Sequence, residues 1–433
     1  MDPRLLAHTL LQKAEKNGQY SNIALDKALT DAAMSEQDSA LAAALFYGVT
    51  EKKITLDHRI AALSSRPIDT LDACVLTALR LGIYQLAYLD RIPDHAAINE
   101  TVSLCPRKSA GFVNAILRSH TRTAPTPLPD KDTKLISYLS IAYSVAPALC
   151  ERFVKAYGKE RAESILRAFG KVPPTTVRVN TLRTSRKELA SHIDGAEPTK
   201  ISPMGLRVKG SVRSLYGFDE GLFFVQDEAS QICVEALGAT EGETVMDICA
   251  CPGSKSFGAA INMKNIGKVL SYDLHEKKLP LIVSGANRLG INIISAAACD
   301  GRNNISELCG KADRVLCDVP CSGLGVLAKK PELRYKDPSV SEALPDVQLA
   351  ILNNACRYVK RGGRLVYSTC TVFPEENEEN VRRFLDTHAE FELTPFTVGN
   401  GALVCADGMI TLLPDEYATD GFFIAVMTRK DEA

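Results

Sequence analysis

This chain of 433 residues lacks several features that assign a protein to a class at once. No apolar run approaches the ~18 residues of a membrane-spanning helix, so no membrane segment is expected. There is no excess of charge of one sign, because 51 lysine and arginine residues stand against 52 aspartate and glutamate residues. A nucleic-acid partner would therefore have to bind a local basic face, since the overall charge attracts no polyanion.

The cysteine and histidine patterns indicate neither a metal site nor a disulfide framework. None of the 13 cysteines forms a C-x-x-C pair, and the seven histidines do not cluster with cysteines at zinc spacing. The first residues, M-D-P-R-L-L-A-H, lack a charged segment followed by an apolar one, so export is not expected. We therefore expect reduced thiols, a cytoplasmic location and no metal.

The chain does contain a short apolar segment that leads through a glycine turn into a helical pattern, E-T-V-M-D-I-C-A-C-P-G-S-K-S-F-G at 243–258. Val245, Met246 and Ile248 fit a buried strand, which Pro252 and Gly253 end in a turn. Such a corner often cradles an adenosine-bearing cofactor. An ordinary strand–turn–helix corner is the alternative, because neither G-x-G-x-x-G nor a Walker loop is present.

Strand and helix patterns alternate from this turn onward, which predicts a mostly parallel, doubly wound, Rossmann-like α/β sheet. The further strands are predicted at 269–273, 291–298, 314–318, 364–367 after a Gly362–Gly363 turn, and 421–427. Ligands of such sheets bind at the carboxyl ends of the strands. The side chains expected at these ends are Asp247, Asp273, Asp300, Asp318 and Cys370.

The earlier part of the chain has a different pattern, and a multidomain protein is expected because single cores stop growing at ~250–300 residues. Leu6, Leu10 and Ala14 recur every four residues and indicate the buried face of a helix. Three prolines between Ala124 and Pro129 predict a stiff linker. The predicted parts are an all-α domain at 1–124, a helical and α/β linker module at 130–235, and the α/β domain at 236–433.

Two acids and two thiols are the candidate reactive groups of the α/β domain. Asp273 follows the glycine turn by ~20 residues, where an acid accepts hydrogen bonds from ribose hydroxyls, and Asp300 suits an adenine amine. Without a pyrophosphate loop, they favour S-adenosylmethionine, although either acid alone is equally a helix N-cap. Methylation of cytosine at C5 needs a thiolate that adds to C6, and Cys321 and Cys370 both follow strands. Burial as small apolar groups is the interpretation for Cys299, Cys317 and Cys356.

The first 120 residues carry the phrases L-R-L-G-I-Y-Q-L, I-P-D-H-A-A-I-N-E and G-F-V-N-A-I-L-R at 79–86, 92–100 and 111–118. These phrases resemble the RNA-binding helical domain of the NusB antitermination factor. The resemblance implies a helical bundle that contacts RNA, with Arg107, Lys108 and Arg118 as candidate phosphate ligands. A solvated surface is the alternative for each of these three residues.

Three motifs of the α/β domain are D-x-C-x-x-P-G-x-K at 247–255, D-V-P-C-S-G-L-G at 318–325 and Y-S-T-C-T-x-x-P-E-E-N-E at 367–378. Over about 170–433 the chain resembles the RNA cytosine-C5 methyltransferases. The resemblance implies a class I fold that uses S-adenosylmethionine and releases S-adenosylhomocysteine. Together with the NusB-like region it implies action on 16S ribosomal RNA by a monomer.

Carried over by position, the resemblance implies a role for each matching residue. Cys370 would be the nucleophile, Cys321 would assist product release, and Asp318 would lie between the cofactor and the base, with Lys255 near the reacting centre. Asp273 would bind the ribose and Asp300 the adenine. The loop around the methionine part would consist of Cys249, Ala250, Cys251, Pro252, Gly253, Ser254 and Lys255.

Three positions depart from the family pattern. Cys251 and Ser254 replace the usual Ala and Gly, and the serine matters only if its backbone needs a positive φ. Tyr335 stands where a tryptophan is frequent and is expected to stack on a base. An enzyme that methylates transfer RNA, or a non-catalytic RNA-binding factor, stays open as an alternative. The NusB-like region favours ribosomal RNA, and the intact cysteines, acids and Lys255 favour catalysis.

Overall fold

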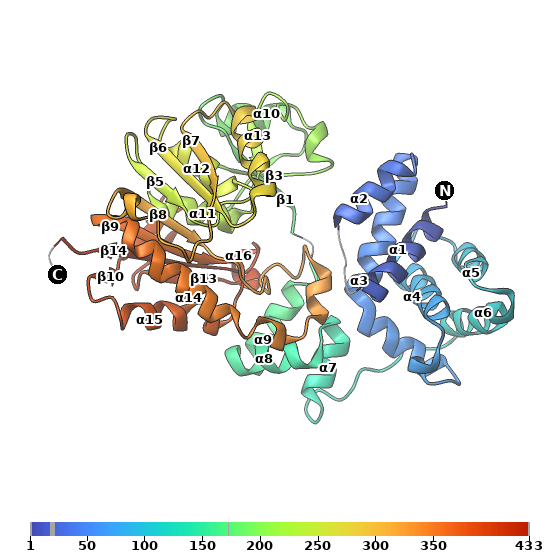
Figure 1. Cartoon of the computed structure of the whole chain (residues 1–433). Helices are drawn as coiled ribbons and strands as arrows, with labels where there is room; N and C mark the ends of the chain where they lie inside the picture. The colour runs from blue at the N-terminus through green and yellow to red at the C-terminus, as the bar shows by residue number, and fades with distance from the viewer. Residues whose placement is uncertain (1, 18–21, 172, 432–433) are drawn as a thin grey trace. The chain divides into compact units, whose positions relative to one another are not determined.

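A computed structural model describes residues 2–17, 22–171 and 173–431 (Figure 1). The chain divides into two units by its contacts. One unit comprises Met1–Gly170 with Lys330–Pro338, and the other comprises Lys171–Lys329 with Ser339–Ala433. The division at 170 lies inside the predicted 130–235 module, so the helical and the sheet-forming parts of that module fall in different units.

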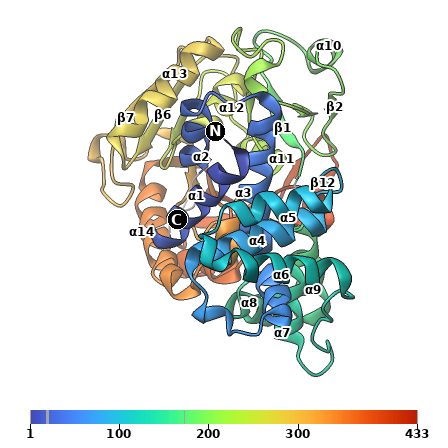
Figure 2. The same cartoon turned by 90° about the vertical axis from the view of Figure 1, so that its right-hand side faces the viewer.

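The first unit begins with helices, as the sequence predicts (Figure 2). Polar caps and prolines set where several of them start: Ser35 accepts the Asp38 N–H, Asp72 accepts the Cys74 N–H, and Pro106 precedes Arg107. The helices are α1 (Pro3–Asn17), α2 (Asn22–Asp31), α3 (Glu36–Leu63), α4 (Ala73–Tyr88), α5 (Asp94–Ser103) and α6 (Arg107–Arg122).

Helix α4 is the centre of this bundle, and its residues Ala78, Leu79 and Ile83 are fully buried. Gly82 lets α6 approach closely, because a Cβ atom at this position would lie 2.6 Å from Leu117. On α1 the predicted face is confirmed, because Leu6 and Ala14 are buried and Leu10 packs against the same core.

Three further helices belong to the same unit: α7 (Leu135–Tyr143), α8 (Pro147–Tyr157) and α9 (Lys159–Ala168). The distant segment Pro331–Tyr335 completes their packing, since the buried guanidinium of Arg334 donates to the carbonyls of Tyr143 and Phe169. The hydroxyl of the next residue, Tyr335, donates within this unit to the Thr50 and Glu51 carbonyls. Stacking of its ring on a base stays a prediction.

The second unit starts with a small four-stranded antiparallel sheet in the order β2-β3-β1-β4. Val177, Leu206 and Phe223 form its core against Leu189 of the adjoining helix. Its elements are β1 (Thr175–Val179), α10 (Arg186–His192), β2 (Glu197–Pro198), β3 (Gly205–Val208) and β4 (Phe223–Val225).

The main sheet has the strand order β10-β14-β9-β8-β5-β6-β7, with β13 paired to β14. Strands β5 to β9 are mutually parallel and β14 is antiparallel to β9, which confirms the predicted doubly wound sheet. Its strands are β5 (Thr244–Asp247), β6 (Lys268–Asp273), β7 (Ile294–Ala298), β8 (Ala312–Asp318), β9 (Val359–Thr369), β10 (Phe391–Leu393), β13 (Met409–Leu412) and β14 (Phe422–Arg429).

One strand boundary was predicted wrongly. Gly362 and Gly363 do not form a turn before a strand but lie inside β9, where the register to β8 shifts. The φ of Gly362 is 70°, as a bulge in a strand allows for glycine. The glycine pair was therefore a signal for a bulge.

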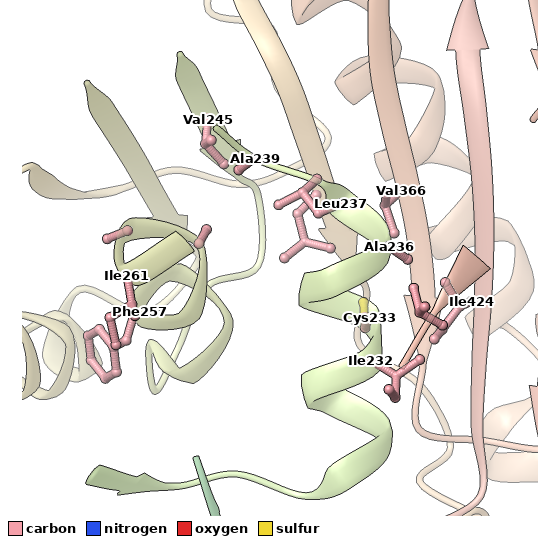
Figure 3. Packing of buried hydrophobic residues seen from close by; sticks show 14 of the residues in the cluster. Ile232, Cys233, Ala236, Leu237, Ala239, Val245, Phe257, Ile261, Val366 and Ile424 are labelled. Carbon is pink, nitrogen blue, oxygen red and sulfur yellow. The ribbon is translucent and has the colours of Figure 1, made fainter. Parts of the chain in front are cut away.

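Helices cover both faces of the main sheet. On one face, α11 (Glu228–Leu237) packs through Ile232 and Ala236 against Val366 and Ile424 (Figure 3), beside α12 (Ser254–Asn262) and α13 (Leu279–Leu289). On the other face lie α14 (Leu344–Ala355) and α15 (Glu378–Leu385). Cys317 and Cys356 are buried in this second core, as expected, whereas Cys299 is partly exposed.

The remaining elements of the described chain lie near its C-terminus: β11 (Phe396–Val398), which pairs with β12 (Leu403–Cys405), and α16 (Pro414–Tyr417). Within the described ranges, no helix has both the length and the apolar character to cross a membrane.

A buried ion network joins three helices of the first unit. The Arg80 guanidinium on α4 donates to both carboxylate oxygens of Asp57 at 2.6 and 2.8 Å, and to Glu15 at 2.5 Å. Burial alone would raise the pKa of Glu15, but the charges of Arg80 and Lys53 hold it below its usual value. The stabilisation from Glu15 is therefore present at neutral pH and is lost as the pH falls through this lowered pKa.

We predict that Arg80→Leu destabilises the helical bundle by roughly 2–4 kcal/mol, because it leaves the partly buried Asp57 carboxylate without its cation and Glu15 with Lys53 alone. Hydrogen exchange of α3 and α4 in the full chain measures this loss. Arg91→Leu removes an exposed arginine and should change the exchange by under ~0.5 kcal/mol. Equal protection in the two variants would show that the network adds no stability.

Candidate active site

The acids and thiols predicted from the sequence converge at one edge of the main sheet. Asp247 ends β5, Asp273 ends β6 and Asp318 ends β8. Asp318 pairs in register with Ser368 on β9, two residues before Cys370. Since these strands are parallel, their carboxyl ends share one edge. Asp300 follows β7 by two residues at the same edge.

The loop after β5 is held against β6 by backbone hydrogen bonds. The Ala250 N–H donates to the Tyr272 carbonyl at 2.8 Å, and the Cys251 N–H donates to Asp273 Oδ2 at 3.1 Å. Gly253 has a φ of 109°, and a Cβ atom there would lie 2.6 Å from the Phe257 ring, so only glycine fits.

The replacement of the usual glycine by Ser254 has no backbone consequence. Ser254 is the first residue of α12 and is not among the positive-φ residues of the described chain. Cys251 has a raised pKa, caused first by burial and then by the Asp273 charge. This thiol is therefore neutral at physiological pH.

The two acids expected to bind the nucleoside differ in their surroundings. Asp273 accepts N–H groups from Cys251 and His275, which fixes the carboxylate and leaves lone pairs for a ligand. The guanidinium of Arg302 donates hydrogen bonds to the Asp300 carboxylate, and the backbone N–H of Arg302 donates to it as well. These hydrogen bonds lower the pKa of Asp300 to about 2. A ligand at Asp300 therefore meets an acid–arginine pair instead of a lone carboxylate.

Asp247 is almost fully buried, with 1% exposure. Its Oδ2 accepts from Ser256 at 2.7 Å, whereas its Oδ1 is buried without a hydrogen-bond partner among the described residues. Burial raises the pKa of Asp247 to about 7. A cationic ligand would satisfy this oxygen and favour the ionised form.

The buried Lys255 and the partly exposed Asp318 form an ion pair at 2.5 Å. Burial alone would lower the pKa of Lys255, but attraction to Asp318 outweighs it and raises this pKa. The ammonium also lies 5.1 Å from the centroid of the Phe422 ring. Ser368 donates to the other Asp318 oxygen at 2.8 Å. Lys255 therefore orients Asp318.

The two candidate thiols are direct neighbours. Cys321 Sγ lies 3.1 Å from Cys370 Sγ and 3.3 Å from the Cys370 backbone nitrogen, which donates to it. Both residues are partly exposed. The pKa of Cys321 is raised well above its usual value, first by the hydrogen bond to Cys370 and then by burial. The structure thus brings together two thiols from loops 49 residues apart.

Some groups at this edge were not foreseen. Lys329 bridges Asp227 and Asp420 at 2.6 and 2.7 Å, and burial followed by the Asp227 charge raises the pKa of Asp420 to about 7. Their signal in the sequence was weak, since an acid before a strand or helix is common. Gln348 and Glu376, which contact the backbone beside Cys321, were also missed.

No set of three histidine, cysteine or acidic residues with metal-binding geometry occurs in the described chain. The groups at this sheet edge therefore offer carboxylates, an ammonium and thiols to a ligand.

Comparisons with known families match the three parts of the chain. The family described as 16S rRNA methyltransferase RsmB/F matches residues 234–428. The NusB family matches residues 1–122, and the ferredoxin-like domain of RsmF/B-like methyltransferases matches residues 148–214. The last match spans the division between the two units.

Similar proteins cover nearly the whole chain. The "Probable ribosomal RNA small subunit methyltransferase B" of Bacillus subtilis (strain 168) is 36% identical and covers 99% of this chain and 98% of its own length. Ribosomal RNA small subunit methyltransferase B of Escherichia coli O127:H6 is 32% identical over 92% of both chains.

Two solved structures share the fold. The crystal structure of PH0851 has a TM-score of 0.80 at 26% identity and covers 99% of both chains. A methyltransferase homolog protein from Pyrococcus horikoshii has a TM-score of 0.59 at 29% identity, over 67% of this chain and 97% of its own. With relatives of this identity along its length, the chain belongs to the 16S rRNA methyltransferase RsmB/F family.

Proposed function

We propose that this protein transfers a methyl group from S-adenosylmethionine to C5 of a cytosine in 16S ribosomal RNA. The relatives named as ribosomal RNA small subunit methyltransferase B support the substrate class. The observation that carries the chemistry is the pair of thiols 3.1 Å apart beside the Lys255–Asp318 ion pair. Cytosine C5 methylation needs a nucleophile for C6 and a group that helps to release it.

The residues at the sheet edge fit S-adenosylmethionine. Asp247 presents a buried, unpartnered oxygen that suits a cationic group, and Asp273 keeps lone pairs for ribose hydroxyls. When bound, the cofactor supplies an electrophilic methyl group on a positively charged sulfur. The loop of Cys249, Ala250, Cys251, Pro252, Gly253, Ser254 and Lys255 would hold its methionine part, and Asp300, with Asp318 nearby, its adenine side.

Cys370 is the proposed nucleophile. As a thiolate it adds to C6 of the cytosine, and the electron pair moves to C5, which then accepts the methyl group. Asp318, fixed by Lys255 and Ser368, is placed to hydrogen-bond the ring of the base. The two hydrogen bonds to Asp318, one to each carboxylate oxygen, hold its orientation while the side chain stays partly exposed to a ligand.

Release requires loss of the C5 proton and cleavage of the Cys370–C6 bond. Cys321, as a thiolate, accepts that proton while the electron pair of the C5–H bond restores the C5–C6 double bond and expels Cys370. The two cysteines would thus have separate roles despite their short distance.

The helical bundle is proposed to bind the RNA as part of a cytoplasmic monomer. Arg107 and Lys108 are exposed at the start of α6, and Arg118 is exposed further along the same helix. Lys108 also lines a surface cavity of about 540 Å³ together with Arg66 and Phe112. Cations beside an aromatic ring suit a nucleic-acid strand.

We predict that Asp273→Ala weakens binding of S-adenosylmethionine about 10- to 100-fold, because a hydrogen bond to a charged group contributes ~1.5–3 kcal/mol. Isothermal titration calorimetry measures the dissociation constant. Glu276→Ala removes an exposed carboxylate from the same loop and should leave the affinity within about twofold. Unchanged affinity in Asp273→Ala would refute the ribose contact.

Replacement of Arg107, Lys108 and Arg118 by glutamine should weaken RNA binding and flatten its salt dependence. Each lost phosphate contact reduces the slope of log K against log salt by ~0.7 for single-stranded RNA. Filter binding at several salt concentrations measures this slope. Glutamines at Lys264, Lys268 and Lys311, near the amino ends of strands of the main sheet, remove equal charge as a control. Equal slopes in both variants would exclude the α6 contact.

The two thiols are distinguished by the covalent adduct with RNA. Cys370→Ala should abolish methyl transfer, because C5 is never activated. Cys321→Ala should still form the thioether but release it slowly, so that an adduct stable on denaturing gels accumulates. The double variant should form none. An adduct in Cys370→Ala that is absent in Cys321→Ala would reverse the roles.

A methylation assay on two kinds of RNA tests the substrate. RNA from 30S subunits and transfer RNA are incubated separately with the wild-type protein, and 5-methylcytosine is measured in each. Methylation confined to transfer RNA would refute the proposed partner, and RNA binding without methylation of either would refute catalysis.

A further inference from the structure

Two fully buried side chains bind the backbone on either side of Cys321. The Gln348 amide donates to the Pro320 carbonyl at 3.0 Å, and the Ser322 N–H donates to Glu376 Oε2 at 2.9 Å. Gln348 also donates to that same carboxylate oxygen at 2.9 Å. Glu376 and Gln348 each have 0% exposure. The Cys321 loop is therefore fixed before and after the thiol.

The Cys370 loop is bound by the residue next to Glu376. Asn377 accepts from the Thr369 hydroxyl at 2.6 Å and donates to the Thr371 carbonyl at 3.1 Å, so it spans Cys370 from both sides. The two cysteine loops also touch directly, because the Ser322 hydroxyl donates to that of Thr371 at 2.9 Å. One consecutive pair of residues thus holds both loops.

Regular secondary structure anchors both Glu376 and Gln348. The Tyr367 hydroxyl on β9 donates to the Glu376 carbonyl at 2.6 Å, and Asn380 on α15 donates to Gln348 on α14 at 3.1 Å. A buried carboxylate is costly unless several donors satisfy it. An apolar residue would fill the same space without that cost, so packing alone does not account for Glu376.

We infer that Glu376 and Gln348 are positioning residues that hold the Cys321 thiol against that of Cys370 for product release. They bind the backbone on either side of Cys321, and the charge of Glu376 also contributes to the raised pKa of that thiol. The inference rests on the proposed function for its chemical part. Its geometric part, the short distance between the thiols, stands without it.

The chemical test compares three variants by the amount of RNA adduct and by single-turnover methyl transfer. In Glu376→Ala and Gln348→Met, release should slow by ~10- to 100-fold, as a displacement of about 1 Å produces, and adduct should accumulate as in Cys321→Ala. Methyl transfer and cofactor affinity should stay within about threefold of wild type. Loss of one contact worth about 1.4 kcal/mol would change either quantity ~10-fold, so a threefold change is smaller than the loss of one contact. Glu376→Gln keeps an acceptor oxygen and should restore much of the release rate.

Asn180→Leu is the matched control. Asn180, which follows β1 in the same unit, is also fully buried and donates to two backbone carbonyls, those of Gly221 and of Leu289 at the end of α13. It should form no excess adduct. Wild-type release in Glu376→Ala, or equal adduct in Asn180→Leu, would overturn the positioning role.

A second measurement reports the thiol distance without RNA. Diamide, an azo oxidant, takes two electrons and two protons from Cys321 and Cys370 to give a disulfide and the corresponding hydrazine. Mass spectrometry of the cross-linked peptide follows its formation in the full-length protein. We expect the rate to fall at least ~10-fold in Glu376→Ala and to stay unchanged in Asn180→Leu, because exchange depends on the approach of the two sulfurs.

The two measurements separate the possible failures. A wild-type cross-linking rate in Glu376→Ala would overturn the inference whatever the RNA assay gives. If Cys321→Ala forms no adduct on any RNA while Glu376→Ala cross-links slowly, the proposed chemistry fails and the positioning of the thiols is supported.

Discussion

The in-register parallel pairing of β5, β8 and β9 is the constraint on which the site depends. It sets Asp247 and Asp318 at one edge and brings Ser368 beside Asp318. The hydrogen bond from Ser368 follows from this register, and Lys255 in the first turn of α12 pairs with the other Asp318 oxygen. A shift of one residue would turn these side chains to the opposite faces of the sheet, where helices cover them. The cores on both faces therefore protect the chemistry as well as the fold.

Charge at this edge is arranged in unequal environments. Asp300 is partly exposed and paired with Arg302, whereas Asp247 is buried with one unpartnered oxygen, and their pKa values lie at about 2 and about 7. One acid is thus ionised in any physiological condition, and a nearby cation would favour the ionised form of the other. The two carboxylates of this sheet edge would therefore attract a positively charged ligand to different degrees.

Much of this organisation could be predicted from the sequence, because apolar strands that end in an acid report both the sheet and its active edge. Contacts between distant residues could not. Glu376 meets Ser322 across 54 positions, and Tyr335 meets Thr50 across 285, so no local pattern shows either contact. Gly362 was misplaced because a glycine pair marks a turn and a bulge equally well. The order of the two thiols followed from the family resemblance and not from their positions.

The path of the chain between the units limits how the protein can be divided. The polypeptide passes between them at 170, at 329 and again at 338, because Lys330–Pro338 belongs to the first unit. Arg334 in this segment is buried against the Tyr143 and Phe169 carbonyls. A cut at residue 170 therefore cannot separate the two units cleanly, because the second piece keeps Lys330–Pro338, which belongs to the core of the first. Exchange of the first unit between relatives would have to transfer two separate segments of the gene together, those that encode Met1–Gly170 and Lys330–Pro338.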